Sequence, residues 1–344
     1  MGNVVLIAGV SGFVGGRLAA LLCADPSVER VIGVDTVPPK DVDRTLLGRT
    51  EFVRADIRNP LIGKVLSQAR VTTVVHSALV GTHPVAGRSS MHEMNVIGTM
   101  QLLAACQKSD DLERVVLKST TAVYDCRPSD PAVFTEDVPL AAGVGAGASG
   151  FARDAIEVEG YIRGFSRRRP DVHVSVLRLA AVIGPTIDSP LTRYLRTPVV
   201  PVNAGFDPRL QLLHETDAVE SLRLAALSAR PGTFNVAGDG VLPLSQVIRR
   251  VGRVRVPVPS AAFTWTGRTV RQTGLGELMS EQPRYLRYGR AVDTTALHER
   301  FGYVPRFDTA AAVASFAAGQ RRQPRIALAG LGALAGLRGA EAAR

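Results

Sequence analysis

Short apolar runs alternate with amphipathic stretches along the first half of the chain. The runs are rich in β-branched residues, and the stretches between them repeat apolar residues at helical spacing. This pattern predicts strands at Asn3–Ala8, Val31–Asp35, Glu51–Arg54, Thr73–His76, Arg114–Lys118 and His173–Leu179, and helices at Gly12–Leu22, Met91–Lys108 and Arg153–Arg168. Such alternation is typical of βαβ units, whose parallel sheet is covered on both faces. We therefore predict an α/β fold with a doubly wound parallel sheet.

The pattern changes after Gly184-Pro185. Proline-punctuated segments follow, and then a helix starting at Asp217 and a strand at Thr233–Ala237 restore the alternation. We expect residues 1–183 to form the sheet domain, with 207–237 returning to it. Residues 184–206 and 238–318 should form a smaller, irregular, mostly C-terminal lobe, and residues 319–344 a basic tail of low complexity.

Composition limits the class of protein to which the chain can belong. Of the 344 residues, 46% are hydrophobic, which suffices for a large core. We expect no secretory leader, because no basic segment precedes the first apolar run, and no transmembrane segment, because no apolar run approaches about 20 residues. The three cysteines are odd in number and widely spaced. This spacing argues against a disulfide framework and a metal site, and it favours the cytoplasm.

The net charge of +10 comes from arginine, because only four of the 41 basic residues are lysine. No recognition motif for DNA or RNA accompanies the charge, so we expect an anionic substrate or a solvated surface rather than a nucleic-acid partner. The apolar run IALAGLGALAGL in the tail is too short to cross a membrane. Weak contact of the basic tail with a membrane surface remains an alternative to a frayed terminus.

The segment GVSGFVG, Gly9 to Gly15, connects the first predicted strand to the first predicted helix. Glycines there permit a tight turn and a close approach of the backbone to a pyrophosphate, and the helix N-terminus offers free N–H groups. Asp35 ends the second predicted strand, where a carboxylate accepts the ribose hydroxyls of an adenosine and repels a 2′-phosphate. The combination predicts a dinucleotide site that prefers NAD to NADP.

Further motifs follow in a recognisable order. They are Asp56-Ile57, VVHSA (Val74–Ala78), NVIGT (Asn95–Thr99), STTAVYD (Ser119–Asp125), LRLAAVIGP (Leu177–Pro185), LLHETD (Leu212–Asp217) and TFNVAGDG (Thr233–Gly240). With these motifs the chain resembles the extended short-chain dehydrogenases/reductases, and among them the NAD-dependent epimerase/dehydratase family in its UDP-glucose 4-epimerase-like branch. The resemblance extends to residue 318 and implies a Rossmann-like fold whose smaller lobe binds the substrate.

The resemblance implies that NAD is the cofactor and that a set of residues lines it. These residues are Gly9, Ser11, Gly12, Phe13, Val14, Asp35, Asp56, Ile57, Ser77, Ala78, Leu79, Asn95 and Ser119. Asp56 is alternatively a cap before Asn59-Pro60, and Asn95 a capping or buried polar residue. We interpret His76 as a satisfied histidine at a strand end rather than as a catalytic base.

The resemblance also implies hydride transfer assisted by a Ser or Thr and by a tyrosine and a lysine four residues apart on one helix. Thr120, four residues before Tyr124, takes the Ser/Thr position. Counting back from Glu159 places Phe151 at the tyrosine and Ala155 at the lysine. No Tyr-x-x-x-Lys occurs anywhere in the chain, because all four lysines precede the first tyrosine, Tyr124. The usual proton donor is therefore missing.

Three other side chains are candidates to replace that donor. Lys118 precedes Thr120 on the same predicted strand, and Arg153 and Asp154 stand in the altered helix. Each also has a structural interpretation: Arg153 and Glu157 are spaced to pair on a solvated helix face, and Lys118 is placed to cap a strand end.

The substrate side departs from the family pattern as well. Ala180 and Ala181 stand where sugar-nucleotide members usually carry an asparagine. Arg209, Gln211 and His214 remain as candidate substrate-binding residues, and Arg209 is suited to a phosphate. Their alternative interpretation is the polar outer face of a strand.

Two functional interpretations follow, and a third is weaker. The first is an NAD-dependent isomerase or oxidoreductase of the epimerase/dehydratase type, a homodimer that acts on a nucleotide sugar or a similar hydroxylated substrate. The second is a non-catalytic NAD-binding sensor or regulatory scaffold, and the third is a membrane-associated subunit tethered by its tail. An enzyme requires an open cavity beside Thr120 with a titratable group in it. A sensor requires that Phe151 and its neighbours fill this space.

Overall fold

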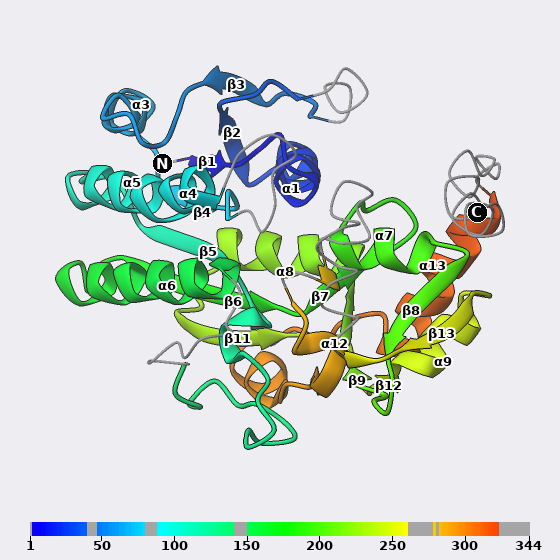
Figure 1. The fold of residues 1–344 in the computed structure, drawn as a ribbon. Helices are drawn as coiled ribbons and strands as arrows, with labels where there is room; N and C mark the ends of the chain where they lie inside the picture. Colours follow the sequence, from blue (N-terminus) through cyan, green and yellow to red (C-terminus); the bar gives the residue numbers. More distant parts are fainter. Residues whose placement is uncertain are drawn as a thin grey trace, which may run out of the picture.

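A seven-stranded parallel sheet forms the centre of the molecule (Figure 1). The computed structural model describes residues 2–39, 47–79, 88–140, 150–260, 278–279 and 282–322. The sheet strands are β1 (Asn3–Ala8), β2 (Val28–Asp35), β3 (Glu51–Arg54), β4 (Thr73–His76), β5 (Arg114–Thr120), β6 (His173–Leu179) and β11 (Gly232–Val236). Their order is β11-β6-β5-β4-β1-β2-β3, and every neighbouring pair is parallel. The predicted doubly wound α/β fold is confirmed.

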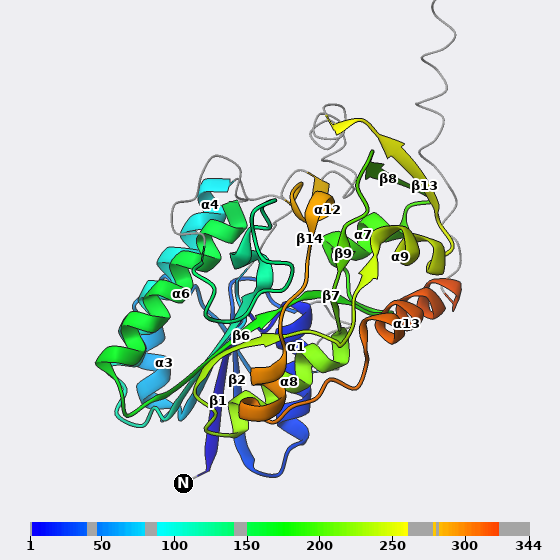
Figure 2. The same cartoon turned by 90° about the horizontal axis from the view of Figure 1, so that it is seen from below.

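Helices cover both faces of this sheet (Figures 1 and 2). Helices α1 (Phe13–Ala24) and α8 (Glu215–Leu227) pack together on one face. The other face carries α3 (Ile62–Gln68), α4 (Arg88–His92), α5 (Gly98–Gln107) and α6 (Gly150–Arg168). The single helix predicted at Met91–Lys108 is interrupted by a π-helical turn, η1 (Glu93–Ile97), which contains Asn95. The helix predicted from Arg153 begins at Gly150, so Phe151 lies in its first turn.

The order of the strands reverses beside β1. The chain passes from β1 outward to β2 and β3, and then returns to the other side of β1 to build β4, β5 and β6. This reversal leaves a crevice at the carboxyl ends of β1 and β4, which is where ligands of open α/β sheets bind. The glycine turn after β1 and the segment after β4 therefore face each other.

A second group of short elements lies beyond the carboxyl ends of the sheet (Figure 2). Its strand pairs are β7 (Ala181–Ile183) with β10 (Leu212–His214), β8 (Val199–Asn203) with β13 (Val254–Val258), and β9 (Arg209–Leu210) with β12 (Leu242–Pro243) and β14 (Gly289–Arg290). Its helices are α7 (Pro190–Arg196), α9 (Leu244–Arg250), α12 (Tyr285–Tyr288) and α13 (Thr309–Arg322), and a π-helical turn, η4 (Leu297–Phe301), packs on β11. Tyr194, Val247 and Phe316 belong to a separate hydrophobic cluster within this group.

The C-terminal segment differs from the sequence prediction at its start. Residues 319–322, expected in the low-complexity tail, belong to α13, where Gly319 packs on Pro185. The remainder of the tail and its predicted membrane contact lie outside the described residues. No helix in the described ranges is both long and apolar enough to span a membrane.

Candidate functional site

The turn between β1 and α1 packs directly on the backbone that follows β4. Gly9 has φ +86°, and a Cβ at this position would lie 2.7 Å from the backbone of Ala78. A Cβ on Gly15 would lie 2.2 Å from the carbonyl oxygen of Gly9. Glycine is therefore required at both positions. A side chain at Gly9 would collide with the segment after β4, and a side chain at Gly15 would collide with the backbone of the turn itself.

The N-terminus of α1 is open to a ligand. Gly12 is its N-cap residue, and no side chain among the described residues caps the helix. A Cβ on Gly12 would have, of the described atoms, the carbonyl oxygen of Gly9 near it, at 3.4 Å. The first-turn amides of a helix have no intrahelical acceptor, and they carry a partial positive charge. These residues, with Ser11, Phe13 and Val14 around them, fit the pyrophosphate of a dinucleotide.

Asp35, at the end of β2, is held beside this turn. Its Oδ2 accepts the backbone N–H of Ser11 at 3.1 Å, and its Oδ1 accepts that of Thr36 at 2.8 Å. The Ser11 hydroxyl donates to the carbonyl oxygen of Val37 at 2.5 Å, which ties the turn to the end of β2. The carboxylate is thereby fixed beside the glycine turn with lone pairs to spare, as ribose recognition requires.

Other expected cofactor residues already have protein partners. The guanidinium of Arg58 bonds both oxygens of Asp56, as close as 2.6 Å, and holds the pKa of that carboxyl below its usual range. Asn95 is buried, and its Nδ2 donates to Asp154 at 2.9 Å. Ser77 is buried behind the glycine turn, where its N–H donates to the carbonyl oxygen of Ala8 at 2.9 Å. These contacts are those of the structural alternatives, a turn-stabilising carboxylate for Asp56 and a buried polar residue for Asn95.

His76 is buried and electrically neutral. Its Nε2 lies 2.7 Å from the Thr99 hydroxyl, whereas Nδ1 has no partner among the described residues. Burial, with a smaller effect from the Lys118 charge, lowers the pKa of His76 to about 4. This is the environment of an internal histidine rather than of a base.

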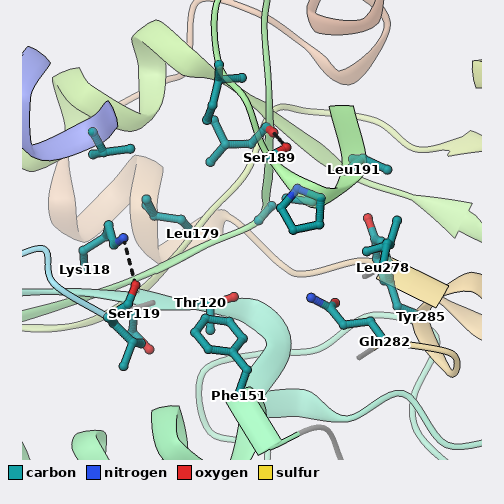
Figure 3. Close-up of a pocket in the computed structure, with 17 residues that line it drawn as sticks. Lys118, Ser119, Thr120, Phe151, Leu179, Ser189, Leu191, Leu278, Gln282 and Tyr285 are labelled. Atoms are coloured by element: carbon teal, nitrogen blue, oxygen red, sulfur yellow. Dashed lines mark hydrogen bonds between the residues drawn. The ribbon is translucent and has the colours of Figure 1, made fainter. Parts of the chain in front are cut away.

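A cavity of about 260 Å³ opens beside the carboxyl ends of β5 and β6 (Figure 3). Val14 of α1 lines it, so the cavity adjoins the glycine turn. Thr120 and Phe151 lie on one side of it, and Gln282 and Tyr285 lie on the other. Its remaining described lining is Leu79, Lys118, Ser119, Leu179, Ala180, Ala181, Val182, Ile187, Ser189, Pro190, Leu191 and Leu278.

Thr120 has a hydroxyl that can act on a ligand. Its Oγ1 accepts the N–H of Ala122 at 3.1 Å and caps the 3-10 turn η2 (Thr121–Tyr124), which leaves the hydroxyl proton available. The neighbouring Ser119 hydroxyl instead donates to Glu159 of α6 at 2.5 Å. Tyr124 is also engaged elsewhere, because its hydroxyl donates to Asn235 at 2.7 Å.

The residues expected at the tyrosine and lysine positions lie in different surroundings. Phe151 presents its ring to the cavity, whereas Ala155 is fully buried in the main hydrophobic core. Ala180 and Ala181 also line the cavity, so no amide from this segment faces a ligand.

The three expected substrate-binding residues lie outside the described lining of this cavity. Arg209 is exposed on β9. Gln211 is buried, donates to the carbonyl oxygen of Gly238 at 3.0 Å and accepts the N–H of Val292 at 2.7 Å. His214 stacks on Phe307 and caps α8. The structure thus gives Gln211 and His214 internal partners.

Sequence reasoning did not identify the residues that complete the cavity from the second lobe. Tyr285 is buried, and its hydroxyl has no partner among the described residues. Gln282 and Leu278 line the same wall. These side chains belong to a segment far from Thr120 in the sequence, and no motif marks them.

A second cavity, of about 510 Å³, adjoins the same segment and is strongly basic. Its described lining is Arg127, Pro128, Ser129, Asn203, Ser260, Pro283, Arg284, Arg287 and Tyr288. Asp125 pairs with Arg127 and with Arg284. The Arg287 guanidinium stacks 4.3 Å from the centre of the Phe206 ring, and its buried Nε lacks a partner among the described residues. The described lining contains three arginines and no acidic side chain, so the cavity is suited to an anion.

Solved structures share this architecture. MoeE5 in complex with UDP-glucuronic acid and NAD has a TM-score of 0.70 at 21% identity, over 93% of this chain and 99% of that chain. dTDP-glucose 4,6-dehydratase from Bacillus anthracis in complex with NAD has a TM-score of 0.71 at 18% identity, over 94% and 97%. A tyrosine-to-phenylalanine mutant of UDP-glucuronic acid 4-epimerase from Bacillus cereus, in complex with UDP-4-deoxy-4-fluoro-glucuronic acid and NAD, has a TM-score of 0.69 at 17% identity, over 92% and 99%. At such identities the similarity shows the fold.

The sequence comparisons identify the family. The chain is 48% identical over 326 residues to the uncharacterized protein Rv0501 of Mycobacterium tuberculosis, which covers 94% of this chain and 86% of the relative. The same values hold for the uncharacterized protein Mb0513 of Mycobacterium bovis. Residues 5–237 match the NAD dependent epimerase/dehydratase family. The chain therefore belongs to this family, and its cofactor is NAD.

Proposed function

We propose that the protein is an NAD-dependent epimerase/dehydratase-type enzyme that acts on a nucleotide sugar without the family's usual tyrosine and lysine. The observation that carries this proposal is the cavity, which joins Val14 of the NAD turn to Thr120 and Phe151. The smaller C-terminal group of elements, which contributes Gln282 and Tyr285, is the proposed substrate lobe.

The roles of the residues follow from their contacts. Held by the glycine turn and Asp35, NAD would supply the acceptor and donor of hydride for the substrate carbon. The glycine turn and Asp35 hold the two ends of the adenosine diphosphate half, and Thr120 donates its hydroxyl proton to the substrate oxygen. Phe151 shapes the cavity but has no proton to exchange, so we expect turnover to be slow.

The basic cavity supports a phosphorylated substrate. The basic cavity and the cavity beside Thr120 share the segment from Gln282 to Tyr288. Gln282 and Tyr285 line the cavity beside Thr120, and Arg284 and Arg287 line the basic cavity. A nucleotide sugar has matching parts, because its diphosphate is anionic and its sugar carries the reacting hydroxyl. The neighbouring structures crystallised with UDP-glucuronic acid and with its fluorinated analogue are consistent with this substrate class.

A non-catalytic NAD sensor is the alternative, and the ring of Phe151 in the cavity favours it. The opposing observation is that the cavity is open and contains a titratable group, Lys118, beside Thr120. We favour the enzyme for this reason.

Two further observations support the proposed location and oligomeric state. Three free cysteines support a reducing cytoplasm. Ile97 and Met100, exposed together near the start of α5, support a homodimer through this helix.

The first test measures NAD affinity by calorimetry. Asp35→Ala should weaken NAD binding roughly 10- to 100-fold, because a charge-assisted hydrogen bond to the ribose contributes about 1.5–3 kcal/mol. Exposed Asp171, replaced by alanine, is the control and should leave the affinity unchanged. Equal affinity of wild type and Asp35→Ala would contradict the proposed cofactor site.

A second test separates an enzyme from a sensor. Absorbance at the NADH band is recorded with UDP-glucose and UDP-glucuronic acid, and an enzyme should produce this band whereas a sensor should not.

A further inference from the structure

A single charged side chain faces the cavity that Thr120 and Phe151 line. Of the described residues around this cavity, Lys118 alone carries a charge at neutral pH. It stands on β5 two positions before Thr120, so strand alternation directs both side chains to the same face of the sheet. Both residues line the cavity in Figure 3, as does Phe151.

The ammonium group of Lys118 has few protein partners. Its Nζ donates to the backbone carbonyl oxygen of Leu79 at 3.3 Å, and it forms no ion pair within the described part of the chain. An ammonium has three N–H donors, so two remain for a ligand. Lys118 is partly buried, and a cation in such a position without a counter-ion destabilises a fold. The arrangement therefore costs stability until a ligand supplies acceptors.

The surroundings of Lys118 lower the pKa of its ammonium group. Val14 of α1 and Leu179 of β6 are apolar, and His76 of β4, the titratable neighbour, is itself neutral. Arg178 of β6 points away, to Glu159. Burial lowers the pKa of Lys118 to about 8. An amine with a pKa in this range exchanges protons efficiently near neutral pH.

We propose that Lys118 is the acid–base residue of this site and takes the place of the phenol that Phe151 lacks. This inference rests on the function proposed above. In the oxidising direction, the O–H bond of the substrate alcohol breaks, its proton passes to the neutral amine of Lys118, and hydride from the same carbon passes to NAD, the oxidant. In the reverse direction the ammonium protonates the carbonyl oxygen as hydride returns to the carbon. Thr120 holds that oxygen throughout.

The small number of lysines makes the proton on Lys118 directly observable. The chain contains four lysines, so methylation with ¹³C-formaldehyde gives a small set of NMR resonances, and Lys118→Arg identifies the one of interest. We expect this resonance to titrate near pH 8, whereas ordinary lysines titrate near about 10.4. Saturating NAD should shift it, and ADP, which lacks the nicotinamide half, should not. Lys64→Arg, an exposed substitution on α3, is the control and should remove a different resonance.

Two results of this titration would overturn the proposal. One is a Lys118 resonance that titrates with the exposed lysines, and the other is a resonance that ignores NAD although calorimetry shows NAD bound. In both cases the proposed function stands without this residue. Absence of NAD binding would overturn the proposed function and this inference together.

A second variant separates an acid–base role from a structural one. Lys118→Met removes the unpaired cation, so the melting temperature of the ligand-free protein should rise. The rate of NADH formation from UDP-glucose should fall about 10²- to 10⁴-fold. The wild-type rate should increase with pH through about 8, because only the neutral amine accepts the proton, and the variant should lose this increase. An unchanged pH profile in Lys118→Met, or bound NAD that the wild-type protein never reduces, would contradict the acid–base role.

Discussion

Gly9 shows how a single residue joins the fold to the cofactor site. Its positive φ and the backbone of Ala78, 2.7 Å from where a Cβ would stand, leave no space for a side chain. The turn can therefore pack against Ala78 and bond to Asp35 only if position 9 is glycine.

Replacing Gly9 with alanine should both destabilise the protein and weaken NAD binding. The new methyl group would strain the left-handed backbone and collide with main-chain atoms, so we expect a loss of more than about 1 kcal/mol. Thermal melting and calorimetry with NAD measure the two effects. Gly160→Ala is a matched control on helix α6, because a Cβ there has no neighbour within 4 Å in the described part of the chain. The control should be neutral or stabilising by up to about 1 kcal/mol.

His76 should make the protein sensitive to acid. Its pKa is about 4 in the folded protein, against 6.5 when exposed. As the pH falls, His76 is therefore protonated at a higher pH in the unfolded chain than in the folded protein. Its contribution to stability is complete above pH 6.5 and is lost between pH 6.5 and 4, a total of about 3 kcal/mol at about 1.36 kcal/mol per pH unit.

Urea unfolding at pH 7 and at pH 4.5 measures this loss. His76→Gln should reduce the difference between the two pH values, whereas the exposed control His173→Gln should retain it. The same pH dependence in both variants would contradict the assignment to His76.

At the scale of elements, a buried ion pair fastens α6 to the sheet. Arg178 of β6 and Glu159 of α6 are 2.8 Å apart, and their side chains are 4% and 3% exposed. Arg178 also donates to the Tyr124 hydroxyl at 2.7 Å, and Glu159 accepts the Ser119 hydroxyl. This network fixes the helix whose first turn carries Phe151.

Removing one partner of this pair should be costly. Arg178→Met leaves the Glu159 carboxylate buried without its cation, for which we expect a loss of about 3–5 kcal/mol in the free energy of unfolding. The control is Arg193→Met, which breaks an exposed pair with Asp188 and should cost less than about 1 kcal/mol. Equal losses in urea titrations of the two variants would show that the buried pair has no special role.

The elements of the sheet could be predicted from the sequence, and those of the second lobe largely could not. β1, β4 and β6 have the predicted bounds, because central strands of a parallel sheet are buried on both faces and are rich in apolar residues. β3 also has its predicted bounds, although it is a partly exposed strand at the edge of the sheet. β13 is mostly exposed, with Val254 61% exposed, so burial imposes no alternation on it. Helices α7 and α9 have seven residues each, too few to show a helical period among prolines.

The candidate site divides in the same way. The glycine turn and Asp35 are recognisable because the chemistry of a pyrophosphate and a ribose fixes their spacing. The position of Phe151 followed from the family pattern. Tyr285 and Gln282 reach the cavity through tertiary packing, which local patterns do not encode. Gln211 and His214 are candidates in the sequence because they are polar residues near the expected substrate pocket, and in the structure both form hydrogen bonds within the protein.

At the scale of the whole molecule, we propose that the sheet holds NAD and that the basic cavity holds the diphosphate of the substrate. Arg287→Met should weaken binding of UDP at least about tenfold, because a guanidinium–phosphate contact is lost, and should leave NAD affinity unchanged. Calorimetry with UDP at low and high salt measures the effect, and affinity should fall as salt rises. The control is Arg249→Met, an exposed substitution on α9 in the same lobe. Equal UDP affinity in wild type and Arg287→Met would contradict the assignment of the basic cavity to the diphosphate.

Helix α12 is a single turn, and the segment around it contributes side chains to two cavities. An anion that draws in Arg284 and Arg287 cannot displace this turn without also moving Gln282 and Tyr285. Binding of an anion in the basic cavity should therefore change the shape of the cavity that Thr120 lines, because both cavities share this turn. Binding of the diphosphate, which undergoes no chemistry, would then control the position of the reacting sugar beside Thr120.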